Sequence, residues 1–380
     1  MSSSLDKGRI KVCILTSVHP PFDGRVFHKE AKTLAKAGYN VVLIAQHTGE
    51  ETIDGVKILP LPRPKNRFVR ITKVVWKLFR LALKEKANVY HFHDPELIPV
   101  GLVLKFFGKK VIYDVHEDYP KQILSSQKWA GNVYVRKFIA FITNIIERSG
   151  AFGFDSIAAA TPDIAKKFNP SKTILIRNFP ILELIDKVQP VDCKTDKPIV
   201  IYAGVLTRIR GIKEIIQAME LVKDKAELWL LGKWESEEFR KECQDLEGWK
   251  HTKYLGLFPL NQVYEYIKGA DIGISTLYPI ENYVTSLPIK AFEYMACSLP
   301  MVMSNFPDWQ ENFGEYALFA NPYSPEDIAE KVLYLLNNPD KAKQLGDRGR
   351  DLAEEEYNWE AEGRKLLDIY GRVLDGTQNE

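Results

Sequence analysis

The sequence predicts an α/β protein built from two Rossmann-like, doubly wound domains that face a common cleft. Short, nearly continuous apolar runs, as expected for strands buried on both faces of a parallel sheet, alternate with helical patterns. This alternation starts again near the middle of the chain. In addition, 380 residues exceed what one ordinary hydrophobic core contains. We therefore expect one domain over residues 1–190 and a second over residues 191–380.

In the first half, the run 9–16 predicts a buried strand, and a helical pattern over 25–37 follows it and ends at Gly38. The mixed, turn-prone segment 181–197 is expected to link the two domains. Between these points, further strands with helical stretches between most of them are predicted at 40–45, 56–61, 88–92, 110–115, 156–160 and 173–176.

In the second half, a strand over 198–203, a loop from Gly204 and a helix over 211–221 repeat the arrangement. Sheets of this kind bind ligands outside the carboxyl ends of their strands, so both domains should contribute to one cleft. The amphipathic stretch 359–374 is a candidate for a last helix that crosses back onto the first domain. Further strands are predicted at 226–231, 251–255, 271–275 and 300–303.

The composition, with 45% hydrophobic and 27% charged residues, is typical of a folded globular protein. The longest apolar stretch, 138–146, is far shorter than the ~20 residues of a membrane-spanning helix, and the first residues show no apolar signal region. The four cysteines are scattered without metal-ligand spacing. These features predict a cytoplasmic protein without disulfides or zinc.

Positive charge is concentrated in the first half. Residues 1–190 contain 30 Lys and Arg against 17 Asp and Glu, whereas residues 191–380 contain 22 against 33. A helical segment, 67–86, combines an apolar stripe with a basic one that consists of Arg70, Lys73, Lys77, Arg80 and Lys84. Such a helix can lie on anionic lipid, which predicts a peripheral position at the inner face of the cell membrane. A sheet-covering helix with a solvated basic face is the alternative. Nucleic-acid binding is not expected, because the stripe lacks interleaved stacking aromatics and any known motif.

The most specific pattern lies in residues 285–304. Ser286 is predicted to cap a helix whose first turn contains Pro288, and this helix start would offer free amide groups to an anion. Lys290 and Glu293 share a helix face with Ser286, so that a carboxylate would lie two turns below the anion site. This arrangement suits a nucleotide. A Lys–Glu surface pair on an ordinary amphipathic helix is the alternative.

A second pattern is the loop from Gly204 to Gly211, which contains Arg208 and Arg210 and lies between a predicted strand and a predicted helix. Two guanidinium groups at the carboxyl end of a strand, next to a helix start, can bind a diphosphate and neutralise its charge as it leaves. A solvated basic loop is the alternative.

In the first half, the loop after the first strand carries another candidate group. Gly24 would let the backbone approach a ligand, and Arg25 and His28 lie near a helix start. A simple turn followed by an exposed first helical turn is the alternative.

Histidine and acidic residues end the two strands that follow, in the segments 91–95 and 114–118. Their residue types would suit a metal cluster or an acid–base set. A metal is not favoured, because no helical His–Glu spacing supports one. Capping of the next helices by Asp94 and Asp118 is the alternative.

Together these motifs resemble the retaining nucleotide-sugar glycosyltransferases of the GT-B fold, a large family that includes sucrose synthase and many bacterial transferases of polysaccharide assembly. The resemblance rests on the loop 204–211 with its helix and on residues 287–300. It extends to residues 19–30, 114–118 and 178–180, and so covers most of the chain.

The resemblance implies that Glu293 hydrogen-bonds the ribose, that Arg208 and Arg210 hold the diphosphate, and that His116 lies beside the donor sugar. Arg210 stands where the family usually has Lys. The loop before Leu287 would touch the sugar and phosphate through backbone amides. The loop at Gly24 would face the acceptor and the donor diphosphate.

The resemblance further implies that the leaving group is stabilised without a metal and that no cofactor is needed beyond the nucleotide diphosphate sugar as co-substrate. At the position where the family usually has a second acid, this chain has Thr285. Either the Thr285 hydroxyl or Glu281, from the same loop, would contact the sugar. Where an Arg usually follows the first loop glycine, this chain has Val205, for which Arg208 would substitute.

We therefore predict a metal-independent hexosyltransferase that acts on a sugar or lipid-linked acceptor in cell-surface polysaccharide or glycolipid assembly. A nucleotide-sugar epimerase of the same fold, which would turn over the donor without an acceptor, is one alternative. A catalytically silent nucleotide-binding partner subunit is another. The predicted catalytic residues are His116, Arg208 and Arg210; the acceptor-side residues are Gly24, Arg25 and His28; the donor-binding residues are Gly204, Glu281, Thr285, Ser286, Leu287, Lys290 and Glu293.

Overall fold

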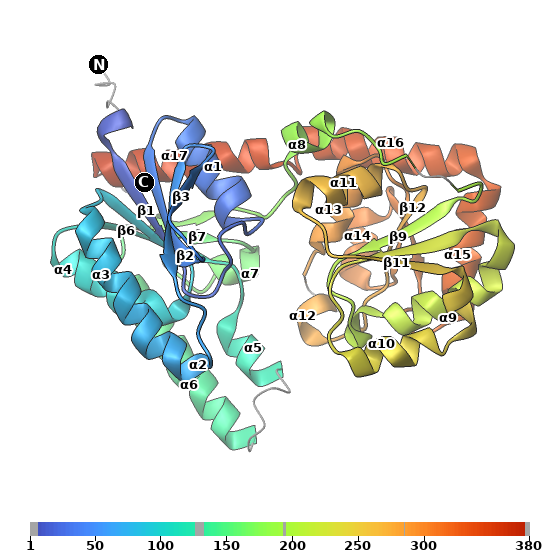
Figure 1. Ribbon diagram of the computed structural model, residues 1–380, viewed down its shortest axis with the longest axis horizontal. Coiled ribbons are helices and arrows are strands. Elements are labelled where there is room, and N and C mark those ends of the chain that lie inside the picture. The colour runs from blue at the N-terminus through green and yellow to red at the C-terminus, as the bar shows by residue number, and fades with distance from the viewer. Residues whose placement is uncertain (1–6, 126–132, 193–194, 285, 377–380) are drawn as a thin grey trace. The chain divides into compact units, whose positions relative to one another are not determined.

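The structure is a computed structural model, and it describes residues 7–125, 133–192, 195–284 and 286–376 (Figure 1). The chain divides into two compact units, each with its own sheet of mainly parallel strands. Unit 1 comprises Met1–Asn178 and Ala361–Glu380, and unit 2 comprises Phe179–Glu360. The prediction of two Rossmann-like α/β domains is confirmed, and the common cleft stays a prediction.

Unit 1 contains an eight-stranded sheet in the order β3-β4-β2-β1-β5-β6-β7-β8. All neighbouring strands are parallel except β3, which pairs antiparallel with β4. Strand β5 is buried along its whole length, because helices cover both faces of the central sheet. The strands are β1 (Lys11–Leu15), β2 (Asn40–Gln46), β3 (Glu51–Ile53), β4 (Val56–Leu61), β5 (Val89–Phe92), β6 (Lys110–Val115), β7 (Ser156–Ala159) and β8 (Thr173–Leu175).

The helices of unit 1 connect these strands. The buried residues of α3 and α4 and the end of α6 share one core cluster with strand side chains, so these three helices cover the same face of the sheet (Figure 1). A wider helical turn, η2 (Val26–Ala31), leads into α1, and another, η3 (Arg70–Val74), joins α2 to α3. The helices are α1 (Lys32–Lys36), α2 (Arg67–Val69), α3 (Val75–Glu85), α4 (Ile98–Phe106), α5 (Tyr119–Ser125), α6 (Val133–Ala151) and α7 (Pro162–Ala165).

Unit 2 contains a six-stranded, fully parallel sheet in the order β11-β10-β9-β12-β13-β14. Its strands are β9 (Ile199–Ala203), β10 (Glu227–Leu231), β11 (Thr252–Gly256), β12 (Ile272–Ser275), β13 (Met301–Ser304) and β14 (Ala317–Ala320). Its helices are α8 (Leu182–Lys187), α9 (Ile212–Val222), α10 (Glu237–Gln244), α11 (Leu260–Lys268), α12 (Glu281–Val284), α13 (Ile289–Ala296), α14 (Pro307–Phe313), α15 (Pro325–Asn337) and α16 (Pro339–Glu355).

The last helix, α17 (Trp359–Asp375), begins in unit 2 and belongs to unit 1 from Ala361 onward. Its Tyr370 is fully buried, and its ring lies 5.7 Å from that of Tyr39. The observed division after Asn178 differs from the expected boundary at 190/191, because Phe179 and Ile185 are buried in a core of unit 2.

The predicted strands 226–231, 251–255, 271–275 and 300–303 agree with β10 to β13 to within one residue at each end. The edge strands β3 and β14 were not predicted, because they are short and only partly buried and so lack a continuous apolar run. Within the described part of the chain, no helix combines the length and the apolar character needed to span a bilayer.

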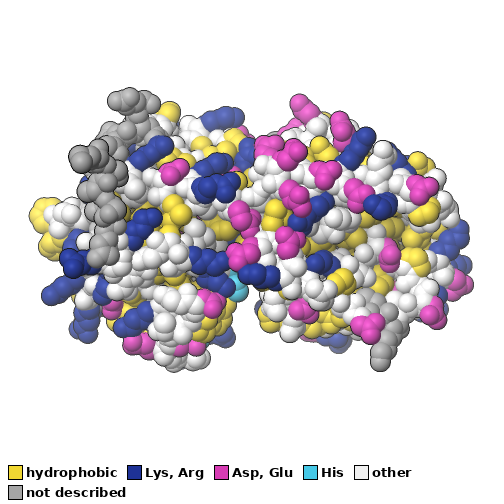
Figure 2. Space-filling view, turned by 90° about the horizontal axis from the view of Figure 1, so that it is seen from above, with side chains coloured by type: hydrophobic (Ala, Val, Ile, Leu, Met, Phe, Trp, Pro, Cys, Tyr) yellow, Lys and Arg dark blue, Asp and Glu magenta, His cyan; other side chains and the backbone are white. Residues whose placement is uncertain are grey.

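Side-chain charge differs between the two units on the face drawn in Figure 2. Dark blue Lys and Arg side chains predominate over unit 1, whereas magenta Asp and Glu side chains are concentrated over unit 2. This distribution follows the charge asymmetry of the sequence.

Candidate functional site

The first candidate site lies at the carboxyl end of β9 in unit 2. Gly204 follows this strand directly, and a Cβ atom placed there would lie 2.5 Å from both Cε and Nζ of Lys290 and 3.4 Å from Nη1 of Arg210. A Cβ there would displace the ammonium end of Lys290, and the backbone has φ +156°, which L side chains rarely adopt, so glycine leaves the end of the strand open to this cation. The structure thus brings together three of the predicted residues, Gly204, Lys290 and Arg210.

Lys290 is partly buried, and its Nζ lies 5.4 Å from the centroid of the Tyr202 ring. Burial lowers the pKa of Lys290 to about 8; Arg210 adds to this shift, and Glu293 opposes it. The ammonium group is thus destabilised by its surroundings and would gain from a nearby anion. Such a perturbed cation at the carboxyl edge of a sheet indicates a functional site.

Arg210 has neutral partners. Its Nη1 lies 3.4 Å from the Tyr202 hydroxyl, and the Tyr283 hydroxyl also hydrogen-bonds the guanidinium group. Burial opposes the charged form, yet the interactions with the two tyrosines raise the pKa of Arg210. Its positive charge is therefore retained without being neutralised by a carboxylate.

Arg208 is placed differently. Its guanidinium group packs on the Phe239 ring, 4.6 Å from the centroid, and forms an ion pair with Glu242 of α10. Lys213 binds the same carboxylate at 3.0 Å, and hydrogen bonds from Arg208 and Lys213 lower the pKa of Glu242 to about 2. The structure therefore does not bring Arg208 to Lys290 and Arg210, because an acidic helix holds it.

The start of α13 differs from the prediction. Helix α13 begins at Ile289, and Pro288 is its N-cap, with extended backbone angles (φ −75°, ψ 129°) and no side-chain capping bond. Ser286 is therefore not the cap; its carbonyl accepts a hydrogen bond from the Trp309 indole at 2.8 Å. Leu287 packs against the core of unit 2. Two further predicted donor residues lie outside this description: Thr285 falls outside the described residues, and so does the side chain of Glu281.

Glu293 is partly buried one turn beyond Lys290, facing Tyr264 of α11. Burial, followed by the charge of Glu293 and a hydrogen bond with it, raises the pKa of Tyr264 well above its usual range. The next residue, Tyr294, anchors α13 to the sheet by donating to the carbonyls of Ile201 and Ile274, both at 3.2 Å. A rigidly anchored helix thus positions both Lys290 and Glu293.

The second candidate site lies in unit 1, where β1, β5 and β6 end beside one another. Arg25 is buried, and its guanidinium group lies 2.9 Å from Asp114 and 2.8 Å from Glu30 and donates to the Ile176 carbonyl at 2.9 Å. The predicted acceptor-side role of Arg25 does not fit this position, because carboxylates and a carbonyl already bind the guanidinium group.

Charge in this network is balanced. Burial would raise the pKa of Asp114, but Arg25 and His116 hold it well below its usual range. Burial and the charge of Asp114 raise the pKa of Glu30 well above its usual 4.5. The network therefore contains an Arg25–Asp114 ion pair, beside which the protonated form of Glu30 is favoured. Burial also lowers the pKa of His93, which stays neutral.

His116 lies at the solvent boundary of this network. Its Nε2 is 3.0 Å from Asp114 and 2.9 Å from Nδ1 of His93, and its side chain is 14% exposed. The ring of His19, from the loop after β1, lies 5.6 Å away. Although burial favours the neutral ring, a hydrogen bond with Asp23 raises the pKa of His19. The side chains of His116 and His19 are therefore accessible to solvent, whereas the Asp114 carboxylate that contacts His116 is buried.

Sequence reasoning missed His19, Asp23, Glu30 and Tyr370. The signal for His19 was its place in the loop after a buried strand, four residues beyond the end of β1, whereas His116 follows β6 directly. Tyr370 gave no such signal, because it comes from α17; its hydroxyl lies 2.9 Å from Nδ1 of His91.

Asp94 and Asp118 differ in their roles. Asp94 is fully buried and accepts hydrogen bonds from Thr16 Oγ1 at 2.9 Å and Ser17 N at 2.6 Å, so it occupies the N-cap position of the next helix without a side-chain capping bond. Asp118 accepts from the Lys121 amide at 3.2 Å and does cap α5.

The other acceptor-side residues lie near the surface of unit 1. Nothing lies within 4 Å of a Cβ placed on Gly24, so the backbone there is open to an approaching group. Asp23 accepts hydrogen bonds from the amides of Arg25 and Val26 at the start of η2. Burial lowers the pKa of His28, which is only partly exposed.

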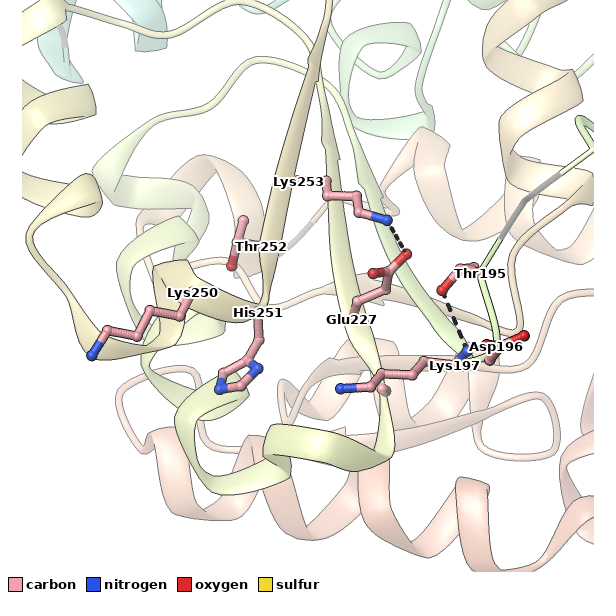
Figure 3. Close-up of a pocket in the computed structure, with 9 residues that line it drawn as sticks. Thr195, Asp196, Lys197, Glu227, Lys250, His251, Thr252 and Lys253 are labelled. Atoms are coloured by element: carbon pink, nitrogen blue, oxygen red, sulfur yellow. Dashed lines mark hydrogen bonds and ion pairs between the residues drawn. The ribbon is translucent and has the colours of Figure 1, made fainter.

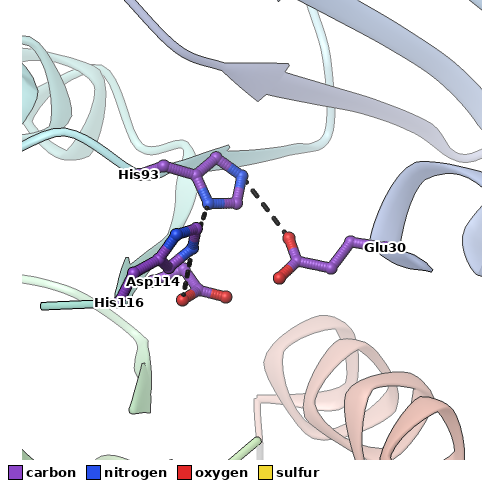
Figure 4. Close-up of side chains that lie close together, drawn as sticks. All are labelled: Glu30, His93, Asp114 and His116. Carbon is purple, nitrogen blue, oxygen red and sulfur yellow. Dashed lines mark hydrogen bonds and ion pairs between the residues drawn. The ribbon is translucent and has the colours of Figure 1, made fainter. Parts of the chain in front are cut away.

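Four side chains of the network, Glu30, His93, Asp114 and His116, offer ligand atoms within 4.8 Å of one another (Figure 4). Such a set could surround a metal ion. However, the guanidinium group of Arg25 binds both carboxylates and supplies the positive charge that a metal would bring. The geometry is thus explained by ion pairs and hydrogen bonds within unit 1.

A pocket of about 350 Å³ lies elsewhere, at the amino ends of β9, β10 and β11 (Figure 3). None of the predicted site residues lines it. Its lysines are paired with carboxylates: Lys197 with Asp224, Lys253 with Glu227, and Lys250 with Glu247. It lies at the opposite edge of the sheet from Gly204 and carries no comparable unpaired charge.

Comparisons with known proteins agree with this architecture. Residues 186–352 match the family model of glycosyl transferases group 1, and residues 24–167 match that of glycosyltransferase family 4. Similar curated proteins include an alpha-maltose-1-phosphate synthase of Mycolicibacterium smegmatis, 22% identical over 76% of this chain and 80% of its own length. Another is an N,N'-diacetylbacillosaminyl-diphospho-undecaprenol alpha-1,3-N-acetylgalactosaminyltransferase of Campylobacter jejuni, 25% identical over 47% of this chain and 46% of its own.

Solved structures of GT-B glycosyltransferases share the fold. A sucrose-phosphate synthase from Thermosynechococcus elongatus superposes with a TM-score of 0.75 at 18% identity, over 97% of this chain and 100% of its own. The Anabaena protein Alr3699/HepE, solved in complex with UDP-glucose, gives a TM-score of 0.70 at 13% identity, over 95% and 99% of the two chains.

Proposed function

Because both halves of the chain match glycosyltransferase family models, the chain belongs to the glycosyltransferases, and we propose that it transfers a sugar from a nucleotide diphosphate sugar with retention of the anomeric configuration. Unit 2 binds the donor in this proposal. The observation that carries it is the convergence of Lys290 and Arg210 on Gly204 at the carboxyl end of β9.

The diphosphate is expected to lie over Gly204. A glycine leaves the backbone open, and neither cation forms an ion pair with a carboxylate of the described residues. As the bond between the sugar C1 and the phosphate oxygen breaks, negative charge grows on the diphosphate, and both cations stabilise it. The acceptor oxygen forms the new bond to C1 on the same face and passes its proton to a phosphate oxygen.

Glu293 is expected to accept hydrogen bonds from the ribose hydroxyls, since its carboxylate lies one turn along α13 from Lys290 on an anchored helix. From unit 1, His116 is proposed to help position the transferred sugar. Its place at the solvent boundary of the buried network leaves it accessible, and Asp114 fixes the orientation of its ring at 3.0 Å.

The proposed acceptor is a growing glycan or a lipid-linked sugar of the cell surface. Support comes from the names of similar proteins, such as the undecaprenol-linked transferase of C. jejuni and a teichuronic acid biosynthesis glycosyltransferase of Bacillus subtilis. Catalysis is proposed to need no metal, because protein cations replace it at the diphosphate; full activity in excess EDTA would support this, and loss of activity restored by Mg²⁺ would contradict it.

The central test combines binding and turnover. Thermal shifts with UDP, GDP, ADP and dTDP would identify the nucleotide, and transfer would then be measured with its sugars. Arg210→Ala and Glu293→Ala should each lower kcat/KM for the donor more than tenfold, about 1.4 kcal/mol. Arg208→Ala is the matched comparison and should have a smaller effect, since that guanidinium is paired with Glu242. No shift with any nucleotide, or less than tenfold loss in both variants, would refute the assignment.

A further inference from the structure

Helix α6 of unit 1 presents a wide apolar face to solvent. Its buried stripe contains Ala140, Glu147 and Gly150, which are spaced as one side of a helix. The opposite side is exposed yet apolar: Tyr134 (78% exposed), Phe138 (65%), Phe141 (60%) and Ile145 (43%) follow one another at intervals of three or four residues. The exposed side chains of Phe138, Phe141 and Ile145 therefore form an apolar patch on the solvent side of α6.

The neighbouring helix α4 packs against the C-terminal end of α6. A Cβ on Gly150 would lie 2.5 Å from Cγ2 of Ile98, so the glycine allows α4 and α6 to pack closely. Just beyond α6, a Cβ on Gly153 would lie 2.9 Å from Cδ2 of Leu102, which is itself exposed. Helix α4 therefore packs at the C-terminal end of α6, about 18 Å along the helix from Phe138. The end of α4 carries Phe106, which is 87% exposed.

Cations surround this apolar surface, and exposed carboxylates are lacking from the helices that form it. In the described segments 67–86, 98–107 and 133–152, the only acids are Glu85, which pairs with Lys11, and Glu147, which is buried and bonded to Tyr113. The same segments carry many cations, including the exposed Lys73, Lys77, Arg80 and Lys84 of the basic stripe and, on α6, Lys137 and Arg148. Of the predicted stripe, only Arg70 is held by a carboxylate, Glu96, at 2.6 Å.

The combination of exposed apolar side chains and cations indicates which kind of partner would bind this surface. Apolar side chains bordered by Lys and Arg suit a membrane interface, where the rings enter the acyl boundary and the cations reach anionic headgroups. A second copy fits less well, because a two-fold interface over this face would bring the same cations together without carboxylates to pair them. We propose that the outer face of α6 inserts into an anionic membrane surface and that the basic stripe of α3 holds it there.

This proposal deepens the proposed function, since it would bring the enzyme to a lipid-linked acceptor, but membrane binding does not depend on sugar transfer. The test is flotation of the purified full-length chain with vesicles of phosphatidylcholine alone or with added phosphatidylglycerol. The wild type should float with the anionic vesicles. The triple variant Phe138→Gln, Phe141→Gln, Ile145→Gln should bind them at least tenfold more weakly, and so should Lys73→Glu, Lys77→Glu, Arg80→Glu.

The matched control replaces two exposed apolar side chains of unit 2, Leu221→Gln with Tyr334→Gln, which are 48% and 46% exposed and should float like the wild type. If the α6 variant fails to fold, Trp76 provides a second measurement. This residue of α3 is 61% exposed, and lipid with brominated acyl chains should quench its fluorescence, taken as the difference between wild type and Trp76→Phe.

Unchanged flotation of a folded α6 variant would overturn the proposal, and so would failure of the wild type to float or absence of Trp76 quenching. A concentration-dependent dimer that the α6 variant dissociates would overturn it in favour of a second copy. Flotation without transfer from any nucleotide sugar would refute the proposed function and leave the membrane surface standing.

Discussion

Lys290 should make nucleotide binding depend on pH above neutrality. Burial lowers its pKa to about 8 in the free protein, and a bound diphosphate would stabilise the protonated form. The donor diphosphate would therefore bind mainly when Lys290 carries its proton. The perturbation is a rise in pH from 7 to 9, together with the variant Lys290→Met, which keeps the length of the side chain and removes its charge.

The magnitude follows from the pKa. With a pKa of about 8, roughly nine tenths of Lys290 is protonated at pH 7 and roughly one tenth at pH 9. If the protonated form alone binds, the apparent Kd rises about tenfold over this range, or about 1.4 kcal/mol. The terminal phosphate of the ligand does not compensate, because its second pKa of about 6 leaves it ionised throughout.

The assay is isothermal titration calorimetry with the nucleoside diphosphate that stabilises the protein most. In buffers of different ionisation enthalpy at pH 8.5, binding should take up about 0.8 proton. Lys290→Met should bind more weakly at pH 7 and take up none, whereas Lys241→Met, on the exposed side of α10, should behave as the wild type. A Kd that is constant from pH 7 to 9, or proton uptake that persists in Lys290→Met, would refute the reasoning.

Three further expectations concern the buried network of unit 1. Arg25→Ala should lower the free energy of unfolding in urea by about 3–5 kcal/mol, because it leaves Asp114 buried without its partner; a loss below 1 kcal/mol would show that the pair is not needed. The pKa of Glu30 is raised in the folded protein, so the stability that this side chain contributes is lost as pH rises through that pKa. The free energy of unfolding of Glu30→Gln should therefore increase relative to that of the wild type between pH 5 and pH 8, and a constant difference would contradict the assignment. Tyr370→Phe should cost about 1 kcal/mol through its bond to His91, with thermal unfolding as the measurement and an unchanged Tm as the contrary result.

Local sequence pattern predicted the strands well because their burial is uniform. Strand β9 is buried at every position, so its apolar run has no interruption, and Gly204 marks its end. Arg210 was located by its loop at the carboxyl end of a predicted strand, and Lys290 by the helix face that it shares with Glu293. The start of α13 was placed too early because Pro288 fits a first helical turn as well as an extended N-cap, and only ψ distinguishes them.

Ion pairs between residues that are distant in sequence could not be predicted from local sequence patterns. Arg25 and Asp114 are 89 residues apart, and nothing near Arg25 in sequence shows that its charge is balanced inside unit 1. The partner of Arg208, Glu242, lies on a different helix for the same reason. The exposed face of α6 was hidden too, because an apolar pattern indicates burial and does not show whether the fold supplies a covering element.

The two arginines that follow the first strands of the units support the proposal that unit 2 binds the diphosphate. Arg25, in the loop after β1, is buried and bound by Asp114, Glu30 and a carbonyl, so its charge holds unit 1 together and is not available to a ligand. Arg210, in the loop after β9, meets tyrosine hydroxyls, which satisfy its hydrogen bonds and leave its charge in place. Beside it, Lys290 is held at a pKa of about 8 by burial. Two positive groups that form no ion pair with a carboxylate of the described residues make a site that an anion would stabilise, and unit 1 has no such pair among the network residues described above.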